Sequence, residues 1–256
     1  MSTWRCQSGL WERCAGVPIG DRGFRYGMSV FETVAIYRGR AIFLEAHLER
    51  LTRASSAMEW GEVVVSGIPE YGVSAQFTGV VRLYITAGVG SPGDSFCGSA
   101  YALFEECEVG AEFSAVRVAS SLAPYLPRPG GWKTGNYWQN VDALTAARRM
   151  GADDALLFNP SGCLVCASMA NVFLEIDGVW KTPAQETGAR DGVVRDWVGQ
   201  EMPVEEALIG PDDVAGCTAC FLSNSRIGVR AVSEIDGRPL RTDISALQRL
   251  YLNHVL

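Results

Sequence analysis

The chain has 256 residues, of which 48% are hydrophobic and 20% charged, so it is globular with a sizeable core and not disordered. Its net charge of -7 argues against a nucleic-acid surface or a polybasic membrane patch, and any anion site must therefore be a local pocket. The N-terminus lacks the apolar core of a signal peptide, and no run approaches a membrane span, which predicts a cytoplasmic protein with no membrane partner.

Eight cysteines and two histidines restrict the metal chemistry that the chain offers. The pairs Cys163/Cys166 and Cys217/Cys220 have ligand-like spacing, but both lie in predicted strands, where residues three apart point to opposite faces. With so few histidines, a multi-histidine centre is excluded, and a hydrolase triad would depend on His47 or on the last turn of the chain. We expect no metal site.

Strands dominate the first half of the chain. Apolar runs and turn signals predict strands at 30–37, 41–43, 79–88, 101–107 and 115–121. Residues 45–58 have helical spacing that places His47, Arg50 and Arg53 together on a polar face, whereas residues 63–65 fit a strand or a loop equally well. The Gly, Ser and Pro residues of 88–98 predict an exposed, mobile loop.

The second half alternates strands and helices after a Pro- and Gly-rich seam. Its predicted strands are 154–158, 163–176, 217–223 and 229–235, its helices 137–150, 192–200 and 244–252, and its main loop 182–188. Helices inserted among dominant strands favour two α+β lobes over a doubly wound sheet. We expect a small lobe at 1–123, a linker at 124–130 and a larger lobe at 131–256.

Lys133 is the residue around which the functional argument is built. Only two of the 22 basic residues are lysines, Lys133 and Lys181, so the chain uses arginine wherever it needs a plain positive charge. A lysine kept against that bias offers a primary amine, which loses its proton and forms Schiff bases as arginine cannot. Lys133 also stands where the Pro- and Gly-rich seam meets a predicted helix.

Three further features suit a phosphate group. Residues 188–195 bring a glycine turn to a helix start, where backbone N–H groups and the helix dipole favour an anion. Ser225 offers a hydroxyl in a polar turn, and Arg50 offers a guanidinium. None of the three is specific alone, but together with an unusual lysine they indicate a phosphorylated aldehyde, pyridoxal phosphate.

A succession of motifs identifies a family resemblance. In chain order these are DRGFRYG-x-x-VFET from Asp21, HLERL from His47, VRLYITAG from Val81, KTGNY from Lys133, SMANVF from Ser168, TP at Thr182, GARDGVVR from Gly188 and LSNS from Leu222. This succession resembles the fold-type IV pyridoxal-phosphate enzymes, or class IV aminotransferases, which include branched-chain and D-amino-acid aminotransferases and aminodeoxychorismate lyase. The resemblance implies a two-lobed α+β fold, a cofactor in the interdomain cleft and a homodimer.

The resemblance also implies roles for individual residues. Lys133 would hold the cofactor as a Schiff base and move protons, and Tyr137 would hydrogen-bond the phenolic oxygen. The residues implied for the phosphate are Arg50, the backbone amides of Val193 and Val194, and Ser225. Gly192, which has no side chain, would allow the backbone to come close to the phosphate. For the substrate it implies Tyr26 and Arg82, although Arg82 fits a buried strand arginine equally well.

Departures from the family pattern narrow the function. Cys166 stands where family members carry the glutamate that keeps the pyridine nitrogen protonated, and a thiol is a poor substitute. Without that protonated nitrogen the cofactor ring is a weaker acceptor for the electrons freed at the substrate α-carbon. This disfavours transamination more than elimination, because in an elimination a leaving group takes the electrons. Ala87 replaces the carboxylate-binding arginine of the D-amino-acid branch, and Met28-Ser29 interrupts the usual YGDG.

We therefore predict a class IV aminotransferase acting on a small amino acid. The alternative is an aminodeoxychorismate lyase that forms 4-aminobenzoate and pyruvate, which the FET at 31–33 and Cys166 favour. A third hypothesis is a degenerate family member that keeps the fold without activity, because Cys166 and Met28-Ser29 both depart from the pattern.

Overall fold

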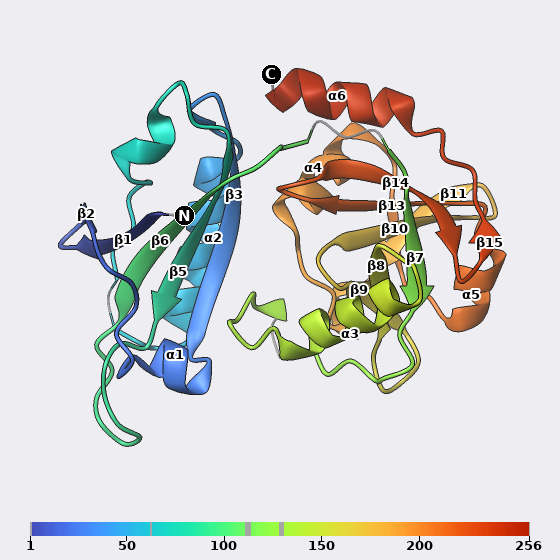
Figure 1. The fold of residues 1–256 in the computed structure, drawn as a ribbon. Helices are drawn as coiled ribbons and strands as arrows, with labels where there is room; N and C mark the ends of the chain where they lie inside the picture. Colours follow the sequence, from blue (N-terminus) through green and yellow to red (C-terminus); the bar gives the residue numbers. More distant parts are fainter. Residues whose placement is uncertain (1, 62, 111–113, 128–130, 256) are drawn as a thin grey trace. The chain divides into compact units, whose positions relative to one another are not determined.

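A computed structural model describes residues 2–61, 63–110, 114–127 and 131–255 (Figure 1). The chain forms two compact units, Met1–Val109 with Trp132–Asn136, and Gly110–Gly131 with Tyr137–Leu256. Each unit combines one large sheet with helices, as the predicted α+β class requires. Lys133 falls in the first unit. The expected folding domains at 1–123 and 131–256 stay a prediction, and residues 128–130 of the expected linker lie outside the described residues.

The first unit contains a six-stranded sheet in the order β2-β1-β6-β5-β3-β4. The strands are β1 (Ser2–Gln7), β2 (Leu10–Arg13), β3 (Ser29–Tyr37), β4 (Arg40–Ala41), β5 (Gly79–Thr86) and β6 (Ser99–Glu106). All their pairings are antiparallel, both between strands joined by short turns, such as β1 and β2, and between strands far apart in the chain, such as β1 and β6. The short helix α1 (Arg22–Tyr26) precedes β3.

Helix α2 (Leu44–Ala57) covers one face of this sheet, where Leu51 and Ala54 pack with Val34 and Leu83. The prediction of a polar face carrying His47 is wrong, because the residue is only 2% exposed. Residues 47 and 51 are one helical turn apart, so a helix that buries Leu51 against the sheet also buries His47.

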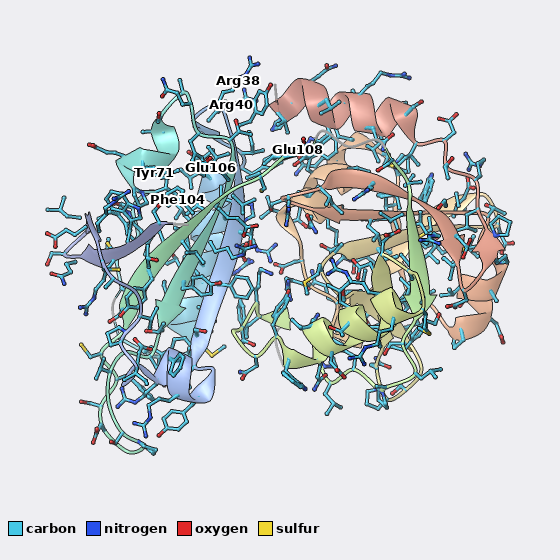
Figure 2. The ribbon with its side chains drawn as sticks, viewed as in Figure 1. Arg38, Arg40, Tyr71, Phe104, Glu106 and Glu108 are labelled. Carbon is cyan, nitrogen blue, oxygen red and sulfur yellow. The ribbon has the colours of Figure 1, made fainter. Side chains whose placement is uncertain are left out.

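The connection between α2 and β5 is anchored on the sheet by one tyrosine. Tyr71, in the 3-10 helix η1 (Glu70–Val73), contacts the Phe104 ring edge-on with 5.2 Å between ring centroids. Its hydroxyl donates to a carboxylate oxygen of Glu106 at 3.2 Å (Figure 2). These contacts fix a long connection against β6.

The second unit contains a nine-stranded mixed sheet in the order β12-β11-β10-β13-β14-β7-β8-β9, with β15 paired to β14. Its strands are β7 (Val116–Ser120), β8 (Asp154–Phe158), β9 (Leu164–Ala167), β10 (Asn171–Ile176), β11 (Val179–Pro183), β12 (Glu205–Ala207), β13 (Ala219–Asn224), β14 (Gly228–Ile235) and β15 (Arg238–Pro239). Its helices are α3 (Trp138–Arg149), η3 (Gln185–Thr187), α4 (Val193–Glu201), α5 (Pro211–Gly216) and α6 (Ser245–Val255). Helix α3 contacts β7 and β8, and α6 contacts β14.

The predicted strand 163–176 is wrong as a single element. It divides into β9, which pairs with β8, and β10, which pairs with β11 and β13. The break comes at Ser168, whose N–H donates at 3.0 Å to the buried carboxylate of Asp154. Burial raises the pKa of Asp154, although the hydrogen bonds from Ser168 act in the opposite direction. The same N–H donates to the Ala155 carbonyl at 2.8 Å, so where the chain changes neighbours a side-chain acceptor supplements the backbone bond to β8.

Two smaller predictions also need correction. Cys163 and Cys217 lie outside strands, the first after the turn that follows β8 and the second at the end of α5. Thr182 belongs to β11 and not to a loop, because its side chain is buried and its hydroxyl donates to the Val172 carbonyl at 2.9 Å.

Within the described part of the chain, there is no group of three or more His, Cys, Asp and Glu side chains that could bind a metal ion. None of the described helices is long and apolar enough to cross a membrane.

Candidate active site

Lys133 is held on the edge of β3 by backbone hydrogen bonds. The Phe31 N–H donates to the Lys133 carbonyl at 2.8 Å, and the Gly135 N–H donates to the Ser29 carbonyl at 2.8 Å. Between these bonds, Thr134 forms an isolated bridge with Val30. The segment around the lysine therefore extends a rigid sheet, although it is remote from β3 in sequence.

The Lys133 side chain lies against an aromatic ring. Its Nζ is 4.0 Å from the ring centroid of Phe31, and that ring stacks on Tyr84 with 5.2 Å between centroids. The negative face of the ring attracts the ammonium group. The amine is therefore partly buried and oriented, which distinguishes it from a solvated surface lysine.

A buried carboxylate lies near this lysine. Glu32 accepts a hydrogen bond from His47 Nδ1 at 2.8 Å, and its other oxygen is 3.5 Å from Arg50 Nε. Burial alone would raise the pKa of Glu32, but the His47 hydrogen bond and the charges of Arg50 and Lys133 together lower it below the ordinary value of 4.5. Arg50 is therefore fixed by an ionised partner, a role of Glu32 that the sequence pattern did not indicate.

Replacing Glu32 with glutamine should lower the free energy of unfolding by about 2 kcal/mol at pH 7, because the mutation removes charge-assisted hydrogen bonds in a buried site. A carboxylate with a lowered folded-state pKa stabilises the protein above pH 4.5 and loses that contribution as the pH falls through the folded-state value. The difference between wild type and Glu32→Gln should therefore begin to shrink as the pH falls below 4.5.

Denaturant unfolding at several pH values tests this expectation. The matched control is Glu49→Gln, the same change at an exposed position of α2, the helix that carries His47 and Arg50. If the free energies of unfolding of wild type and Glu32→Gln differ by the same amount from pH 7 down to pH 3.5, the charge of the Glu32 carboxylate is not the cause of the stability difference.

The two residues predicted to contact substrate lie in the first unit. Tyr26 ends α1 and is 42% exposed, with the Arg25 guanidinium 4.9 Å from its ring centroid. Arg82 is partly exposed on β5 and donates to the Glu105 carboxylate at 2.7 Å. Arg82 is thus a paired strand arginine, and its substrate role stays a prediction.

Arg22 anchors the exposed segment 88–98. The residue is 1% exposed, and its guanidinium donates to the Ala87 carbonyl at 3.1 Å and to the Ser91 carbonyl at 3.1 Å. Two further carbonyls, of Asp94 and Ser95, accept from the same group at 3.3 Å. The arginine of the DRG motif is the sequence signal for this anchor, although the motif alone does not show which carbonyls it binds.

In the second unit, Tyr137 precedes α3 and pairs with an arginine. Arg190 Nη1 donates to the Tyr137 hydroxyl at 3.1 Å, and the guanidinium carbon is 5.8 Å from the centroid of the tyrosine ring. The Arg190 carbonyl in turn accepts from the Asn171 amide at 2.8 Å and from Arg195 at 3.1 Å. Sequence reasoning singled out the GARDGVVR turn for phosphate and missed this second use of it.

At the N-terminus of α4, the packing around Gly192 leaves no room for a side chain. Gly192 is the N-cap, and a Cβ there would lie 1.9 Å from the Asn171 Oδ1. Ser223, which pairs with Asn171 across β10 and β13, is completely buried, and its hydroxyl oxygen has no hydrogen-bond partner within the described residues. A buried hydroxyl beside a helix N-terminus fits a phosphate, so these residues are compatible with the cofactor.

Cys166, on β9, packs in a small apolar cluster with Ala155, Leu157 and Tyr125. Burial, with a smaller contribution from Cys166, raises the pKa of Tyr125 to about 12, although the Arg190 charge opposes the shift. Tyr125 therefore stays neutral. Cys166 is thus surrounded by apolar side chains and by the neutral phenol of Tyr125.

The predicted site residues divide between the two units. The first holds Tyr26, Arg50, Arg82 and Lys133, and the second holds Tyr137, Cys166, Gly192, Val193, Val194 and Ser225. The amides of Val193 and Val194 belong to the first turn of α4, where the intrahelical bonds have not yet begun, and Ser225 follows β13. The functional roles of these residues stay predictions.

Comparison with known proteins identifies the class. The family model of class IV aminotransferases matches residues 29–235, which is more than half of the chain. The chain belongs to this family, and it is therefore a pyridoxal-phosphate-dependent enzyme of the aminotransferase or lyase type.

Relatives with different activities cover the chain almost equally well. A branched-chain-amino-acid aminotransferase of Pseudomonas aeruginosa is 26% identical over 84% of this chain and 78% of its own length. A D-alanine aminotransferase of Listeria monocytogenes is 25% identical over 87% and 83%, and an aminodeoxychorismate lyase of Vibrio harveyi is 24% identical over 89% and 90%.

A solved structure supports the fold. The branched-chain aminotransferase of Thermoproteus uzoniensis superposes with a TM-score of 0.86, covering 99% of this chain and 94% of its own, at 21% identity. The two-lobed fold-type IV architecture predicted from the motifs is thereby confirmed.

Proposed function

We propose that this chain binds pyridoxal phosphate through Lys133 and acts on a small amino-acid substrate as an aminotransferase. The observation that carries this proposal is the setting of Lys133, whose backbone is fixed to β3 and whose amine lies 4.0 Å from the Phe31 ring centroid. A lysine fixed in this way presents one amine in one orientation, as a covalent attachment site needs.

The remaining residues provide for the other parts of the cofactor. Arg50, oriented by Glu32, and the start of α4 with Ser225 would hold the phosphate. Tyr137 would donate to the phenolic oxygen, and Gly192 would allow the close backbone approach. When bound, the cofactor supplies an electron sink for chemistry at the substrate α-carbon. Lys133 would carry the proton to and from that carbon.

Cys166 favours the second candidate function, an aminodeoxychorismate lyase. Its surroundings are apolar, with a phenol that stays protonated, so Cys166 offers no carboxylate to hold the pyridine nitrogen protonated. An elimination depends less on a strong electron sink than a transamination does, because the leaving group takes the electrons. The family relation to lyases and aminotransferases is compatible with both candidates. We propose a homodimer, as the family resemblance implies.

A single-turnover experiment separates the two activities. The purified protein, loaded with pyridoxal phosphate, is mixed with a panel of amino acids and, separately, with 4-amino-4-deoxychorismate. Conversion of bound pyridoxal to pyridoxamine by amino acids supports the aminotransferase. Formation of 4-aminobenzoate without pyridoxamine from any amino acid would replace it with the lyase.

A further inference from the structure

Helix α3 packs on the second unit through one face only. On this inner face Asn140 is buried, and its amide donates to the Ser168 carbonyl at 2.8 Å. Ala143 and Ala147 lie on the same face and pack in the apolar cluster of Ala155. Residues three and four apart share one side of a helix, so the opposite side of α3 is a separate, outer face.

The outer face of α3 carries a tryptophan. Its central stripe consists of Trp138, Asp142, Thr145 and Arg149, which are spaced four, three and four residues apart and are all exposed. Trp138 is 79% exposed, although a tryptophan side chain usually buries most of its surface. The neighbouring Val141 is exposed as well.

Further exposed apolar side chains lie at the two ends of the helix. Leu126 is held at the first turn, because its N–H donates to the side-chain oxygen of Gln139 at 2.9 Å, and it is 61% exposed. Met150, the C-cap, is 66% exposed. With Trp138 and Val141 they give α3 an exposed apolar surface along its length, which is typical of a protein contact site.

The charges of the outer face are opposite in its two halves. Asp142 lies in the N-terminal half and Arg149 in the last turn, and within the described part of the chain neither has an ion pair. Between them lie two small residues, Thr145 and Ala146. The Thr145 hydroxyl donates to the Val141 carbonyl at 2.8 Å, so its methyl group is left to make external contacts.

We propose that the outer face of α3 binds the same face of a second copy of this chain, in an antiparallel helix pair. A two-fold axis between Thr145 and Ala146 places residues equally far before and after it side by side. Asp142 of each copy then meets Arg149 of the other copy, and Val141 of each copy meets Met150 of the other.

This self-complementarity is the reason for choosing a second copy as the partner. An acid in one half and a base in the other match an identical helix only when its direction is reversed, and a two-fold axis makes each contact twice. The axis passes the small side chains of Thr145 and Ala146, where two helices can approach closely. The inference rests on the homodimer in the proposed function, to which it assigns a surface.

Removing the tryptophan should weaken the dimer strongly. In the pyridoxal-phosphate-loaded protein, Trp138→Ala should raise the dimer dissociation constant by about 30-fold or more, because each dimer loses two buried aromatic contacts. Sedimentation equilibrium over a range of protein concentrations measures this constant. The matched control is Leu250→Ala, which truncates an exposed apolar side chain of α6 and should leave the constant unchanged.

Reversing the charges tests the antiparallel register. Asp142→Arg and Arg149→Asp each bring like charges together across the axis, and each should raise the dissociation constant by about tenfold. The double variant restores opposite charges and should return the constant to within about threefold of wild type. A structural role of either residue would instead make the losses add. Arg249→Asp, at an exposed position of α6, is the control.

The possible outcomes separate this inference from the proposed function. A wild-type dimer whose dissociation constant is unchanged by Trp138→Ala, or a double variant as weak as the single variants, would overturn the inference and leave the homodimer in place. A wild type that is monomeric at every concentration would overturn both, since another partner would then cover this face. Thermal unfolding checks each variant first, and Trp138→Gln replaces Trp138→Ala if the latter does not fold. Schiff-base absorbance of the same samples tests cofactor binding independently.

Discussion

Replacing Lys133 with arginine should reduce turnover by about 10³-fold or more, since removal of a covalent catalytic group costs at least that much in enzymes built around one. Arginine keeps the positive charge over the Phe31 ring, but its guanidinium cannot form a Schiff base. The fold should therefore survive, with a change in unfolding free energy within about 0.5 kcal/mol.

Lys181→Arg is the natural control, because it changes the only other lysine of the chain. Lys181 lies on β11, where it pairs with Leu174. Steady-state kinetics should show wild-type turnover for this variant. Comparable losses in both variants would mean that the effect at Lys133 is a general consequence of losing a lysine.

The second large effect is expected from Cys166→Glu. A carboxylate beside the pyridine nitrogen raises the pKa of that nitrogen, and a shift of one unit corresponds to about 1.4 kcal/mol, or a factor of about ten. We therefore expect amino acids to convert bound pyridoxal to pyridoxamine about tenfold faster in the variant than in wild type. Single-turnover absorbance spectra measure this rate directly.

Cys166→Gln separates charge from size. Glutamine has nearly the shape of glutamate but no charge, so it should leave the rate close to that of wild type. Both substitutions enlarge a side chain that packs with Ala155 and Leu157, and the overpacking costs about 1–3 kcal/mol of stability, which thermal unfolding checks first. If Cys166→Gln and Cys166→Glu accelerate pyridoxamine formation equally, the missing carboxylate does not explain the slow rate of the wild type.

Elements with strong periodicity could be predicted from the sequence. The strand 30–37 and the helix at 45–58 appear as β3 and α2 because their apolar patterns are long and regular. The helix start at Gly192 appears as the N-cap of α4, because glycine there avoids a clash with Asn171.

Features that depend on distant neighbours could not be predicted. His47 is predicted on a polar face because histidine is a polar residue, and the carboxylate of Glu32 on β3, which pairs with its ring in the buried position, is 15 residues away in the chain. Ser168, where the predicted strand breaks, is hydrogen-bonded to Asp154 on β8, and the Arg190–Tyr137 pair joins two motifs that are 53 residues apart. Each of these contacts is a specific polar pairing, which hydrophobic periodicity does not encode.

The N-terminal hairpin was missed although its signal is local. β1 and β2 are joined at Ser8 and Gly9, which have φ values of 52° and 82°. Two consecutive residues in the left-handed region are typical of the tight turn that suits a two-residue hairpin, and a Ser-Gly dipeptide favours it.

The central claim, that Lys133 carries the cofactor, is tested most directly by chemical trapping. The protein is loaded with pyridoxal phosphate, reduced with borohydride, digested, and mapped by mass spectrometry for the phosphopyridoxyl group. Our account predicts a single labelled peptide that contains Lys133, and no label in the Lys133→Arg variant. A label on Lys181, or no label on the wild-type chain, would contradict it.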